Sequence, residues 1–562
     1  MNRFSFATLL TLALLTHSDP ARGDHGEVEW PHGVVTSAHP LASEAGASIL
    51  REGGNAVDAA IATAFAIAVV EPHGSGLGGG GFAVVLSAEN GETASLDFRE
   101  TAPAKSVRDM YLVDGRADPE LSRTGGLAVA VPGFVRGMET LHRSHGELKW
   151  ALLLAPAIQL ATEGFPVDRI LADRITLSAS RFNDAAKQIF MPAGEALGAG
   201  DPLIQRDLAR TLQRIADAGA DVFYTGTIAA SIAATTRRAG GILTEADLAN
   251  WKATWRAPVR GAYRGMEIVS MPPPSSGGVH LIQMLHILEG FDLKAAGYGS
   301  ARAWHWMAEA MKFAYADRSL HLGDPDFHDV PVERLISRPH ADAQRARIRT
   351  DGVVPFESVG GIAIELPEGD NTSHLSVIDR HGNAVASTLT INLSFGSGLV
   401  AKGTGVVLND EMDDFAAAPG VPNAFGLVGS EANAIGPGKR PLSSMTPTIV
   451  LKEGDVFMVT GSPGGSRIIT TVLQTILHVV DFGMDMPTAV RVPRIHHQWY
   501  PPVVYHEPFG ISPDTARSLE LIGHTLKTRG RIGNAQSILV PTAKGPRIGA
   551  GDPRGNGSSR GH

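Results

Sequence analysis

The chain has 562 residues, 43% of them hydrophobic and 19% charged, which is the composition of a globular protein large enough for several domains or one large layered fold. Its 49 basic and 58 acidic residues give a formal net charge of −9, and this acidic balance argues against nucleic acid as a partner. Because the chain has no cysteine, disulfides, thiolate metal sites and a cysteine nucleophile are excluded.

The N-terminus has the pattern of a secretory signal peptide. Arg3 precedes an apolar stretch, Phe4–Leu15, that is too short to span a bilayer. Small residues at Ala21 and Gly23 mark a cleavage site, so we predict removal of residues 1–23 and export to the periplasm or the medium. An anchored or fortuitous apolar end is the alternative. No later stretch reaches about 18 uninterrupted apolar residues, so no membrane span is predicted in the mature chain.

The first strong element is a helix over residues 55–70, with Asn55 as its N-cap and Pro72 beyond its end. Its residues are small and apolar all round, which is typical of a helix in the interior. The following "GSGLGG" (74–79) matches the dinucleotide-binding pattern G-x-G-x-x-G. That motif needs a strand before it and a helix after it, and here the order is reversed. We therefore interpret the glycines as allowing close backbone packing and positive φ.

Apolar periodicity predicts further helices at 145–165, 201–218, 226–240 and 301–320. A strand from residue 267 leads through the rigid "MPPPSSGG" loop to a helix that begins near Val279. After Thr372 the pattern changes to strands at 374–379, 384–392, 403–408, 446–451 and 456–461, and a helix follows at about 466–482. The Gly-rich, polar end, about 553–562, is predicted to be disordered. Such mixed elements favour sheets layered between helices.

Residues 374–392 read as a β-hairpin with "RHGN" at its turn. In its first strand His374 and Ser376 share one face, together with Ile378, and Leu375 and Val377 share the other.

Two polar clusters have the composition of a metal site but not its spacing. His496 and His497 are adjacent, so on a strand they point to opposite faces and cannot share one metal. The acidic cluster at 410–414 is interrupted by Met412 and lacks the alternation of a calcium loop. It is either a solvated cluster or a set of carboxylates that binds a ligand amine. No metal is predicted.

Three segments carry residues suited to chemistry at an amide. The turn "GSPGG" (461–465) follows a strand and precedes a helix, so its N–H groups can form an oxyanion hole; a plain tight connection is the alternative. Ser443 and Ser444 lie in a loop that enters a strand, and Arg99 ends a strand, where it can hold a carboxylate through two hydrogen bonds. Taken singly, these would be an ordinary turn and a surface ion pair.

Taken together, these segments resemble the gamma-glutamyltranspeptidase family of N-terminal-nucleophile hydrolases. The resemblance extends from about Val34 to Arg554 and rests on "EGGNAVDAA", "GLGGGGF", "DFRETAP", "MPPPSSGG", "NTSHLSV", "NDEMDDF", "GPGKRPLSSMTPT" and "GSPGGSRII". It implies an α/β (α+β) fold, a four-layer αββα sandwich formed jointly by two chains cut from one precursor. Residues 24–371 would form the large subunit and residues 372–562 the small one.

The family cuts its precursor before a threonine, which places the cleavage here between Asn371 and Thr372. A threonine hydroxyl needs a base before it can act as a nucleophile, and in the uncut chain the nitrogen of Thr372 is an amide. Cleavage frees an α-amine with a reference pKa of about 7.7–8.0, and this amine can take the proton of its own hydroxyl. Cutting the chain therefore creates the base.

The resemblance also implies a role for each site residue. Thr390 would hydrogen-bond the nucleophile, and Gly464 and Gly465 would supply the oxyanion hole. The α-carboxylate of a γ-glutamyl group would be bound by Arg99, Ser443 and Ser444, and its α-amine by Asn392, Glu411 and Asp414. The implied reaction is attack on a γ-glutamyl amide such as glutathione, followed by transfer to water or to an amino acid or dipeptide, without a cofactor.

The chain departs from the family pattern at two positions. Ser373 stands where a second threonine is common, and Phe425 stands where many bacterial relatives have a tyrosine on a loop over the pocket. Without the phenol hydroxyl, a latch to Asn392 cannot form, which leaves the balance of hydrolysis and transfer open.

Two other functions are compatible with much of this pattern. One is a related glutaryl (cephalosporin) acylase, whose substrate has no α-amine and would leave Asp414 desolvated without a partner. The other is a binding protein that keeps the fold but never cleaves. The intact Thr372 and Thr390 argue against it.

Overall fold

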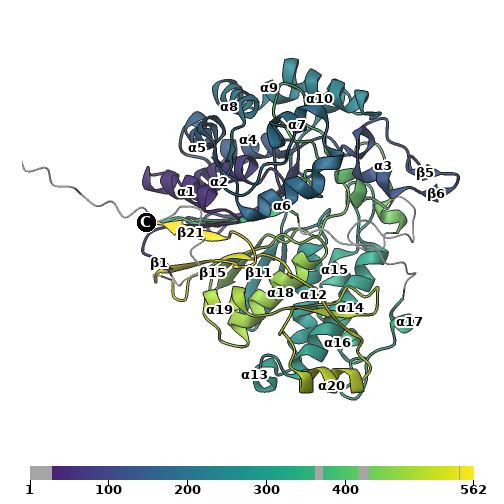
Figure 1. Ribbon diagram of the computed structural model, residues 1–562. Coiled ribbons are helices and arrows are strands. Elements are labelled where there is room, and N and C mark those ends of the chain that lie inside the picture. The colour runs from purple at the N-terminus through teal and green to yellow at the C-terminus, as the bar shows by residue number, and fades with distance from the viewer. Residues whose placement is uncertain (1–27, 361–370, 417–429, 544) are drawn as a thin grey trace, which may run out of the picture.

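Two seven-stranded antiparallel sheets form the centre of the computed structural model, which describes residues 28–360, 371–416, 430–543 and 545–562 (Figure 1). The first sheet has the order β1 (Val28–Trp30), β20 (Arg547–Gly551), β19 (Gln536–Leu539), β15 (Asp455–Thr460), β14 (Thr448–Lys452), β11 (Met266–Ser270) and β10 (Val259–Tyr263). The second has the order β21 (Ser558–Gly561), β2 (Val34–Ser37), β12 (Ser373–Ile378), β13 (Ala384–Thr390), β3 (Gly80–Leu86), β4 (Thr93–Asp97) and β9 (Thr254–Arg256).

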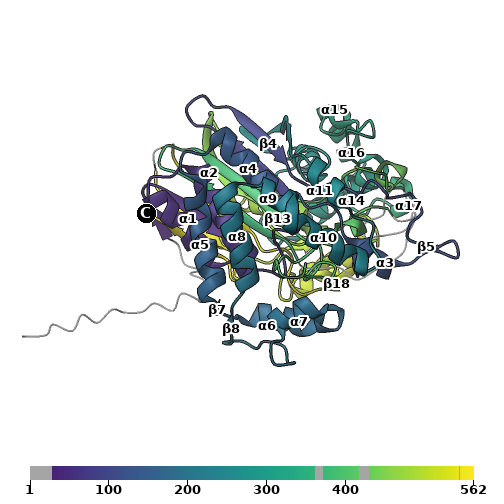
Figure 2. The same cartoon turned by 90° about the horizontal axis from the view of Figure 1, so that it is seen from above.

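The two sheets pack face to face through a buried apolar layer, in which Val34 and Ile378 of the second sheet meet Val269 and Val459 of the first. Helices cover the two outer faces (Figures 1 and 2). The second sheet is covered by α1 (Pro40–Arg51), α2 (Ala56–Val70), α4 (Phe134–His145), α5 (Trp150–Glu163) and α8 (Arg206–Ala218), and the first by α12 (Gly277–Leu288), α14 (Ala301–His321) and α18 (Arg467–Val480). The expected four-layer αββα architecture is confirmed.

Further helices and strands surround these layers. They are α3 (Pro119–Arg123), α6 (Arg169–Ser178), α7 (Asp184–Phe190), α9 (Asp221–Tyr224), α10 (Gly226–Arg238), α11 (Glu245–Asn250), α13 (Leu293–Ala296), α15 (Val332–Leu335), α16 (Arg338–Arg345), α17 (Phe356–Val359), α19 (Met486–Arg491), α20 (Pro513–Leu521), β5 (Leu112–Val113), β6 (Arg116–Ala117), β7 (Phe165–Pro166), β8 (Pro202–Leu203), β16 (Ile495–His496), β17 (Val504–His506) and β18 (Leu526–Thr528).

The buried helix predicted at 55–70 is confirmed as α2. The side chain of Asn55 accepts hydrogen bonds from the backbone N–H groups of Val57 and Asp58, and the carboxylate of Asp58 accepts one from the N–H of Asn55. This reciprocal cap fixes the start of the helix. Every residue of α2 is buried, which explains why its sequence has no polar face.

The glycine run after α2 packs closely against the backbone near Thr390 and Val407. A side-chain carbon at Gly78 would lie 2.1 Å from the carbonyl oxygen of Val407, and one at Gly79 would lie 2.0 Å from that of Thr390. Because α2 precedes the run and β3 follows it, the run does not have the context of a dinucleotide site. The close-packing part of the interpretation is confirmed, whereas the positive-φ part is wrong, because none of the four glycines at 74–79 adopts a positive φ.

The predicted alternation along β12 is also confirmed. Leu375 and Val377 enter the core shared with α2, whereas the hydroxyl of Ser376 donates to the carbonyl of Gln536 in the opposite sheet. β12 lies between β2 and β13, so it occupies the interior of its sheet. Thr372, which immediately precedes β12, is therefore held at a fixed place.

Two predictions in the C-terminal half are wrong. Residues 403–408 form no strand, because Gly403 and Gly405 adopt φ of +73° and +71°, which an extended strand does not accommodate. The C-terminal end is not disordered, since residues 558–561 form β21 and pair with β2. Composition alone missed this strand because the backbone of β2, not the side chains of the tail, provides its partners.

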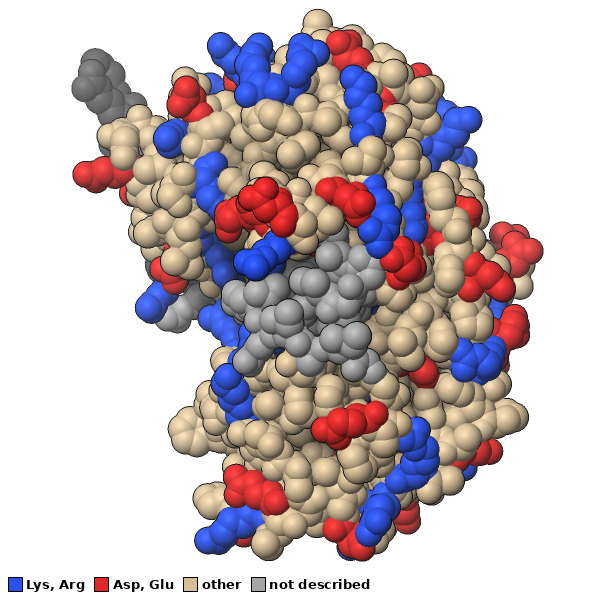
Figure 3. Space-filling view, turned by 90° about the vertical axis from the view of Figure 1, so that its right-hand side faces the viewer, with Lys and Arg blue, Asp and Glu red and all other residues tan. Residues whose placement is uncertain are grey.

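The surface seen in Figure 3 mixes Lys and Arg with Asp and Glu among the residues drawn in colour. None of the helices in the described part of the chain is long and apolar enough to cross a membrane. The predicted signal peptide, residues 1–23, lies outside the described residues, as does Phe425.

Candidate active site

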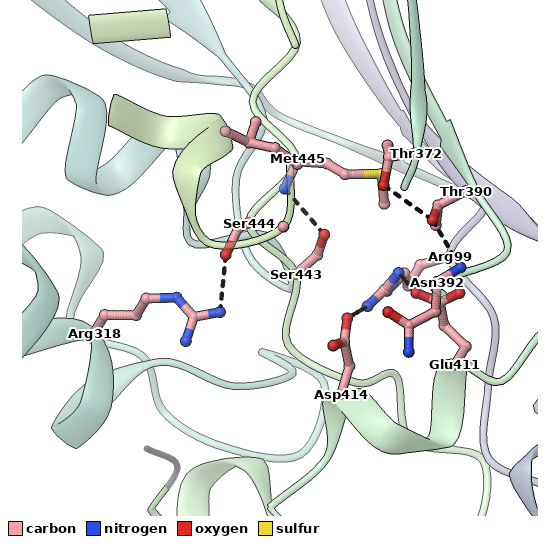
Figure 4. Close-up of a pocket in the computed structure, with 12 residues that line it drawn as sticks. Arg99, Arg318, Thr372, Thr390, Asn392, Glu411, Asp414, Ser443, Ser444 and Met445 are labelled. Carbon is pink, nitrogen blue, oxygen red and sulfur yellow. Dashed lines mark hydrogen bonds and ion pairs between the residues drawn. The ribbon is translucent and has the colours of Figure 1, made fainter. Parts of the chain in front are cut away.

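The structure brings all ten predicted site residues together around Thr372. One pocket is lined by nine of them, namely Arg99, Thr372, Thr390, Asn392, Glu411, Asp414, Ser443, Ser444 and Gly465 (Figure 4). The tenth, Gly464, lines an adjoining hollow that also includes Thr372. The residues come from both sides of the expected cleavage point.

The candidate nucleophile lies where two neighbouring strands bring two hydroxyls together. Thr372 immediately precedes β12 and Thr390 ends β13, and their Oγ1 atoms are 3.2 Å apart. The backbone N–H of Asn392 donates to the Thr390 hydroxyl at 2.8 Å, so that hydroxyl keeps its own proton to donate. Thr390 is thereby oriented to hydrogen-bond Thr372.

The backbone of Thr372 adopts a conformation that is rare for its residue type. Its φ is +120°, a region in which a β-branched residue is an outlier. Such a conformation costs about 1–3 kcal/mol and persists only where the surrounding structure imposes it. The strain is located at the peptide unit that the sequence marks for cleavage.

Gly464 and Gly465 form the turn between β15 and α18. Their φ values are +131° and +57°, which favour glycine. The turn places the N-terminal end of α18 beside Thr372, since Gly465 and Ile468 line the same pocket. The backbone N–H groups of the turn and the helix dipole make this end suitable for a developing negative charge.

Charged side chains that the resemblance assigns to opposite ends of a substrate pair with each other in this structure. The guanidinium of Arg99 donates to the carboxylates of both Glu411 and Asp414 (Figure 4). Its side chain is only 1% exposed. If the site binds the carboxylate and the ammonium that the resemblance implies, these groups would exchange partners with the three side chains, which would keep every buried charge paired.

A further carboxyl group lies behind this cluster. Glu100 is fully buried and its nearest oxygen is 3.8 Å from Arg99. Burial and the neighbouring Glu411 raise the pKa of Glu100 well above its usual range, which favours its neutral form. Glu411 and Asp414 are then the two acidic groups that pair directly with Arg99, and burial raises the pKa of both.

Sequence reasoning missed Arg318, a buried residue of α14 that lines the same pocket. Its guanidinium donates to the hydroxyl of Ser444 at 3.1 Å and to that of Ser276 at 2.9 Å. Burial lowers the pKa of Arg318 to about 10, which leaves it charged at neutral pH. It adds a positive charge on the Ser444 side of the pocket. No motif marks it, because it lies in an ordinary helical stretch.

The two serine-containing loops support each other. The N–H of Ser276, from "MPPPSSGG", donates to the carbonyl of Ser443 at 2.8 Å, and the Ser276 hydroxyl donates to the same carbonyl at 2.7 Å. The hydroxyl of Ser443 accepts a hydrogen bond from the N–H of Met445. The hydroxyl of Ser443 is thus held by its own loop, and that of Ser444 by Arg318 of α14.

The described residues include one group with the composition of a metal site, His305, Glu309 and His524. Its donor atoms already have partners. The rings of His305 and His524 hydrogen-bond each other at 2.8 Å, and the ammonium of Lys312 donates to Glu309 at 2.5 Å. The ammonium of Lys312 would repel a metal cation there, so the group does not fit a metal. His496 and His497 bond separately, to Thr470 and Trp499.

An αββα sandwich with a threonine at the start of a central strand and an oxyanion turn beside it defines the class of N-terminal-nucleophile hydrolases. The sequence model described as Gamma-glutamyltranspeptidase matches residues 42–562. The chain therefore belongs to the gamma-glutamyltranspeptidase family.

Individual relatives agree with this assignment. The chain is 48% identical over 526 residues to the glutathione hydrolase proenzyme of Escherichia coli (strain K12), covering 93% of this chain and 90% of that protein. It resembles the crystal structure of cephalosporin acylase from Bacillus halodurans with 29% identity and a TM-score of 0.83, over 98% of this chain and 99% of that one. It also resembles Helicobacter pylori gamma-glutamyltranspeptidase with 46% identity and a TM-score of 0.56, over 57% of this chain and 92% of that one.

Proposed function

We propose that this chain is a glutathione hydrolase and γ-glutamyltransferase that activates itself by cleavage between Asn371 and Thr372. One observation carries the proposal. The Thr372 hydroxyl, hydrogen-bonded to Thr390, faces the same pocket as buried charges of both signs. The name of the Escherichia coli relative, glutathione hydrolase proenzyme, supports both the substrate and the processing.

The strained backbone supports the proposed cleavage point. The φ angle of Thr372 is defined by the carbonyl carbon of Asn371, so breaking that bond removes the strained dihedral. Cleavage also converts the amide nitrogen of Thr372 into an amine, which can act as the base for its own hydroxyl. One event thus releases strain and creates the catalytic base.

The mature enzyme then acts on a γ-glutamyl amide. Oγ1 of Thr372 attacks the γ-carbonyl carbon of the substrate while the hydroxyl proton passes to the α-amine of Thr372 itself. The Gly464–Gly465 turn stabilises the oxyanion that forms. The carbon–nitrogen bond of the amide breaks, and the departing amine takes the proton. Water or the amine of an acceptor then attacks the ester, which restores the Thr372 hydroxyl and releases glutamate or a new γ-glutamyl amide.

The pocket supports recognition of a zwitterionic head group. Asp414 and Glu411 provide the negative side, with Asn392 beside them, and Ser443 and Ser444 provide the other side. Arg99 lies between these two sides and donates hydrogen bonds to Glu411 and Asp414 when no substrate is present. We infer that the substrate's carboxylate takes over Arg99 while its ammonium takes over the released carboxylates.

The proposal extends to assembly and location. Residues 24–371 and 372–562 would remain together as a heterodimer, and the apolar N-terminal stretch supports export with removal of residues 1–23. The acceptors would be amino acids or short peptides, and the donors glutathione and other γ-glutamyl compounds.

Mass analysis of the purified protein tests the proposal directly. We expect a small subunit whose sequence begins Thr-Ser-His-Leu, and release of glutamate from glutathione by the processed protein. Thr372→Ala should remain a full-length chain without activity, whereas Thr372→Ser should retain part of both functions because the hydroxyl survives. A Thr372→Ala protein that is cut at this bond, or that releases glutamate, would contradict the assignment.

A glutaryl acylase is the second candidate, and the similarity to the Bacillus halodurans cephalosporin acylase is the observation in its favour. A glutaryl group has a carboxylate but no α-amine. Asp414, whose side chain is 11% exposed, would then lose a partner on binding such a substrate. The retained acidic pair therefore favours the γ-glutamyl group.

A further inference from the structure

A second hollow adjoins the candidate active site and shares Thr372 with it. Its lining includes Gly464, Arg174, Arg531, Asn534 and Asn556, none of which lines the first pocket. The nucleophile and the two glycines of the oxyanion turn thus form the wall between two hollows. A γ-glutamyl group held in the first pocket places the other half of its amide, the leaving group, on the side of the second.

Two of the three arginines that line this hollow are available for an anion. Arg174 belongs to α6 and Arg531 to the loop between β18 and β19, and neither forms an ion pair with a carboxylate of the described residues. Arg554 also lines the hollow, but its guanidinium is bound to Glu507 and Asp552.

The other titratable groups of the hollow do not neutralise these two arginines completely. Burial lowers the pKa of His73 to about 4, so it is neutral at physiological pH. Burial raises the pKa of Glu71 to about 7, and its carboxylate accepts the hydroxyl of Ser373 at 2.6 Å. The charge of Asp168 raises the pKa of both groups. Asp168 also caps α6, where its carboxylate accepts a hydrogen bond from the N–H of Leu171. The lining therefore carries a net positive charge.

We propose that this hollow is a carboxylate subsite for the leaving group and for the acceptor, in which Arg174 and Arg531 bind the terminal carboxylate of a peptide or amino acid. The side-chain amides of Asn534 and Asn556 can donate to the same group. This subsite rests on the proposed γ-glutamyl transfer. It explains how the enzyme distinguishes amides of amino acids and peptides from amides of uncharged amines.

Two donors that differ only in this charge test the subsite. Glutathione ends in a carboxylate, and its C-terminal amide has nearly the same shape without the charge. The wild-type enzyme should show the higher kcat/KM for the acid, and Arg174→Gln combined with Arg531→Gln should lower that value about tenfold. The value for the amide should stay within about twofold. The acid's advantage should also shrink in 0.5 M NaCl, because partly exposed charges are screened.

Arg169→Gln provides the matched control, since Arg169 is exposed on the same helix and does not line the hollow. It removes the same charge and should leave both donors unchanged. Equal losses for acid and amide in the double variant, or no loss for the acid, would overturn the subsite while leaving the proposed function intact. Failure of the wild-type enzyme to release glutamate from either donor would instead overturn the proposed function, and the subsite with it.

Discussion

At the scale of single residues, the site is organised by charges that pair with one another until a substrate arrives. Arg99 is almost fully buried and bonds Glu411 and Asp414 directly. An unpaired charge in such a place costs several kcal/mol. A ligand that carries only one charge would leave one member of the cluster alone, whereas a zwitterion leaves none. We therefore expect the buried cluster to select substrates that carry a pair of opposite charges.

Asp414→Asn tests this selection. We expect kcat/KM for a γ-glutamyl donor to fall at least about a hundredfold, because a charge-assisted bond to the ammonium contributes roughly 2–3 kcal/mol. The turnover of a glutaryl amide, which has no ammonium, should change much less. Parallel kinetics on matched γ-glutamyl and glutaryl anilides provide the measurement, and equal losses would show that Asp414 does not contact the amine.

Glu71 links the stability of the precursor to pH. Its pKa is raised from 4.5 to about 7, so between these values the folded chain holds a proton that the unfolded chain has released. The contribution of Glu71 to the free energy of unfolding is therefore greatest below pH 4.5 and falls as pH rises, by at most about 3 kcal/mol above pH 7.

Glu71→Gln should remove this dependence. In uncleaved Thr372→Ala protein, the substitution should be more favourable to stability at pH 8 than at pH 5, since glutamine never ionises but can still accept the Ser373 hydroxyl. Denaturant unfolding at the two pH values gives the comparison. A variant whose effect on stability is identical at both would show that Glu71 is not titrating in this range.

At the scale of elements, the C-terminal strand has a structural role that its composition conceals. β21 pairs along its whole length with β2, and the hydroxyl of Ser43 in α1 donates to the carbonyl of Ser558 at 2.8 Å. The N–H of His562 donates to the carbonyl of Gly33. Without β21, β2 becomes an exposed edge strand.

Deletion of residues 557–562, which removes β21 but keeps Arg554 and its ion pairs, should therefore destabilise the protein. Each lost backbone hydrogen bond contributes about 1 kcal/mol net, so a four-residue pairing implies a loss of roughly 3–4 kcal/mol. The thermal unfolding midpoint should fall by several degrees and processing should slow. Arg560→Gln, which keeps the backbone pairing, is the control. An unchanged midpoint in the deleted protein would mean that β21 contributes nothing to stability.

The sequence predicted most of the other elements correctly where a local signal was strong. α2 followed from its cap and its apolar composition, and the turn before α18 from its glycines. The wrong strand at 403–408 arose because apolar residues suggested extension, whereas two glycines with positive φ turn the chain there. Local composition cannot report which backbone conformation a glycine adopts.

At the scale of the whole molecule, the two proposed subunits are interleaved within both sheets. Across the second sheet, β21 of the small subunit is followed by β2 of the large one. Next come β12 and β13 of the small subunit, and then β3, β4 and β9 of the large one. The first sheet likewise joins β1, β11 and β10 to four strands of the small subunit. Cleavage before β12 cuts a connection but no strand pairing.

We therefore expect the cleaved chains to stay together without a covalent link. Size-exclusion chromatography of the processed protein in neutral buffer should give one species that contains both fragments in equal amounts, even on dilution. Separation should require denaturant, because it exposes the apolar layer between the sheets. Free small subunit in neutral buffer would contradict the interleaved arrangement.

The sequence by itself determined the family, and it predicted a nucleophile and the other residues of the site, because these lie in long motifs whose order along the chain is specific. Only the tertiary structure decided how their charges are paired, that Arg318 joins them, that the tail completes a sheet, and that Thr372 stands between two hollows. The physical reason is the same in each case. Charge pairing, burial and strand partnership depend on residues hundreds of positions apart, such as Arg99 and Asp414, and no local pattern records such contacts.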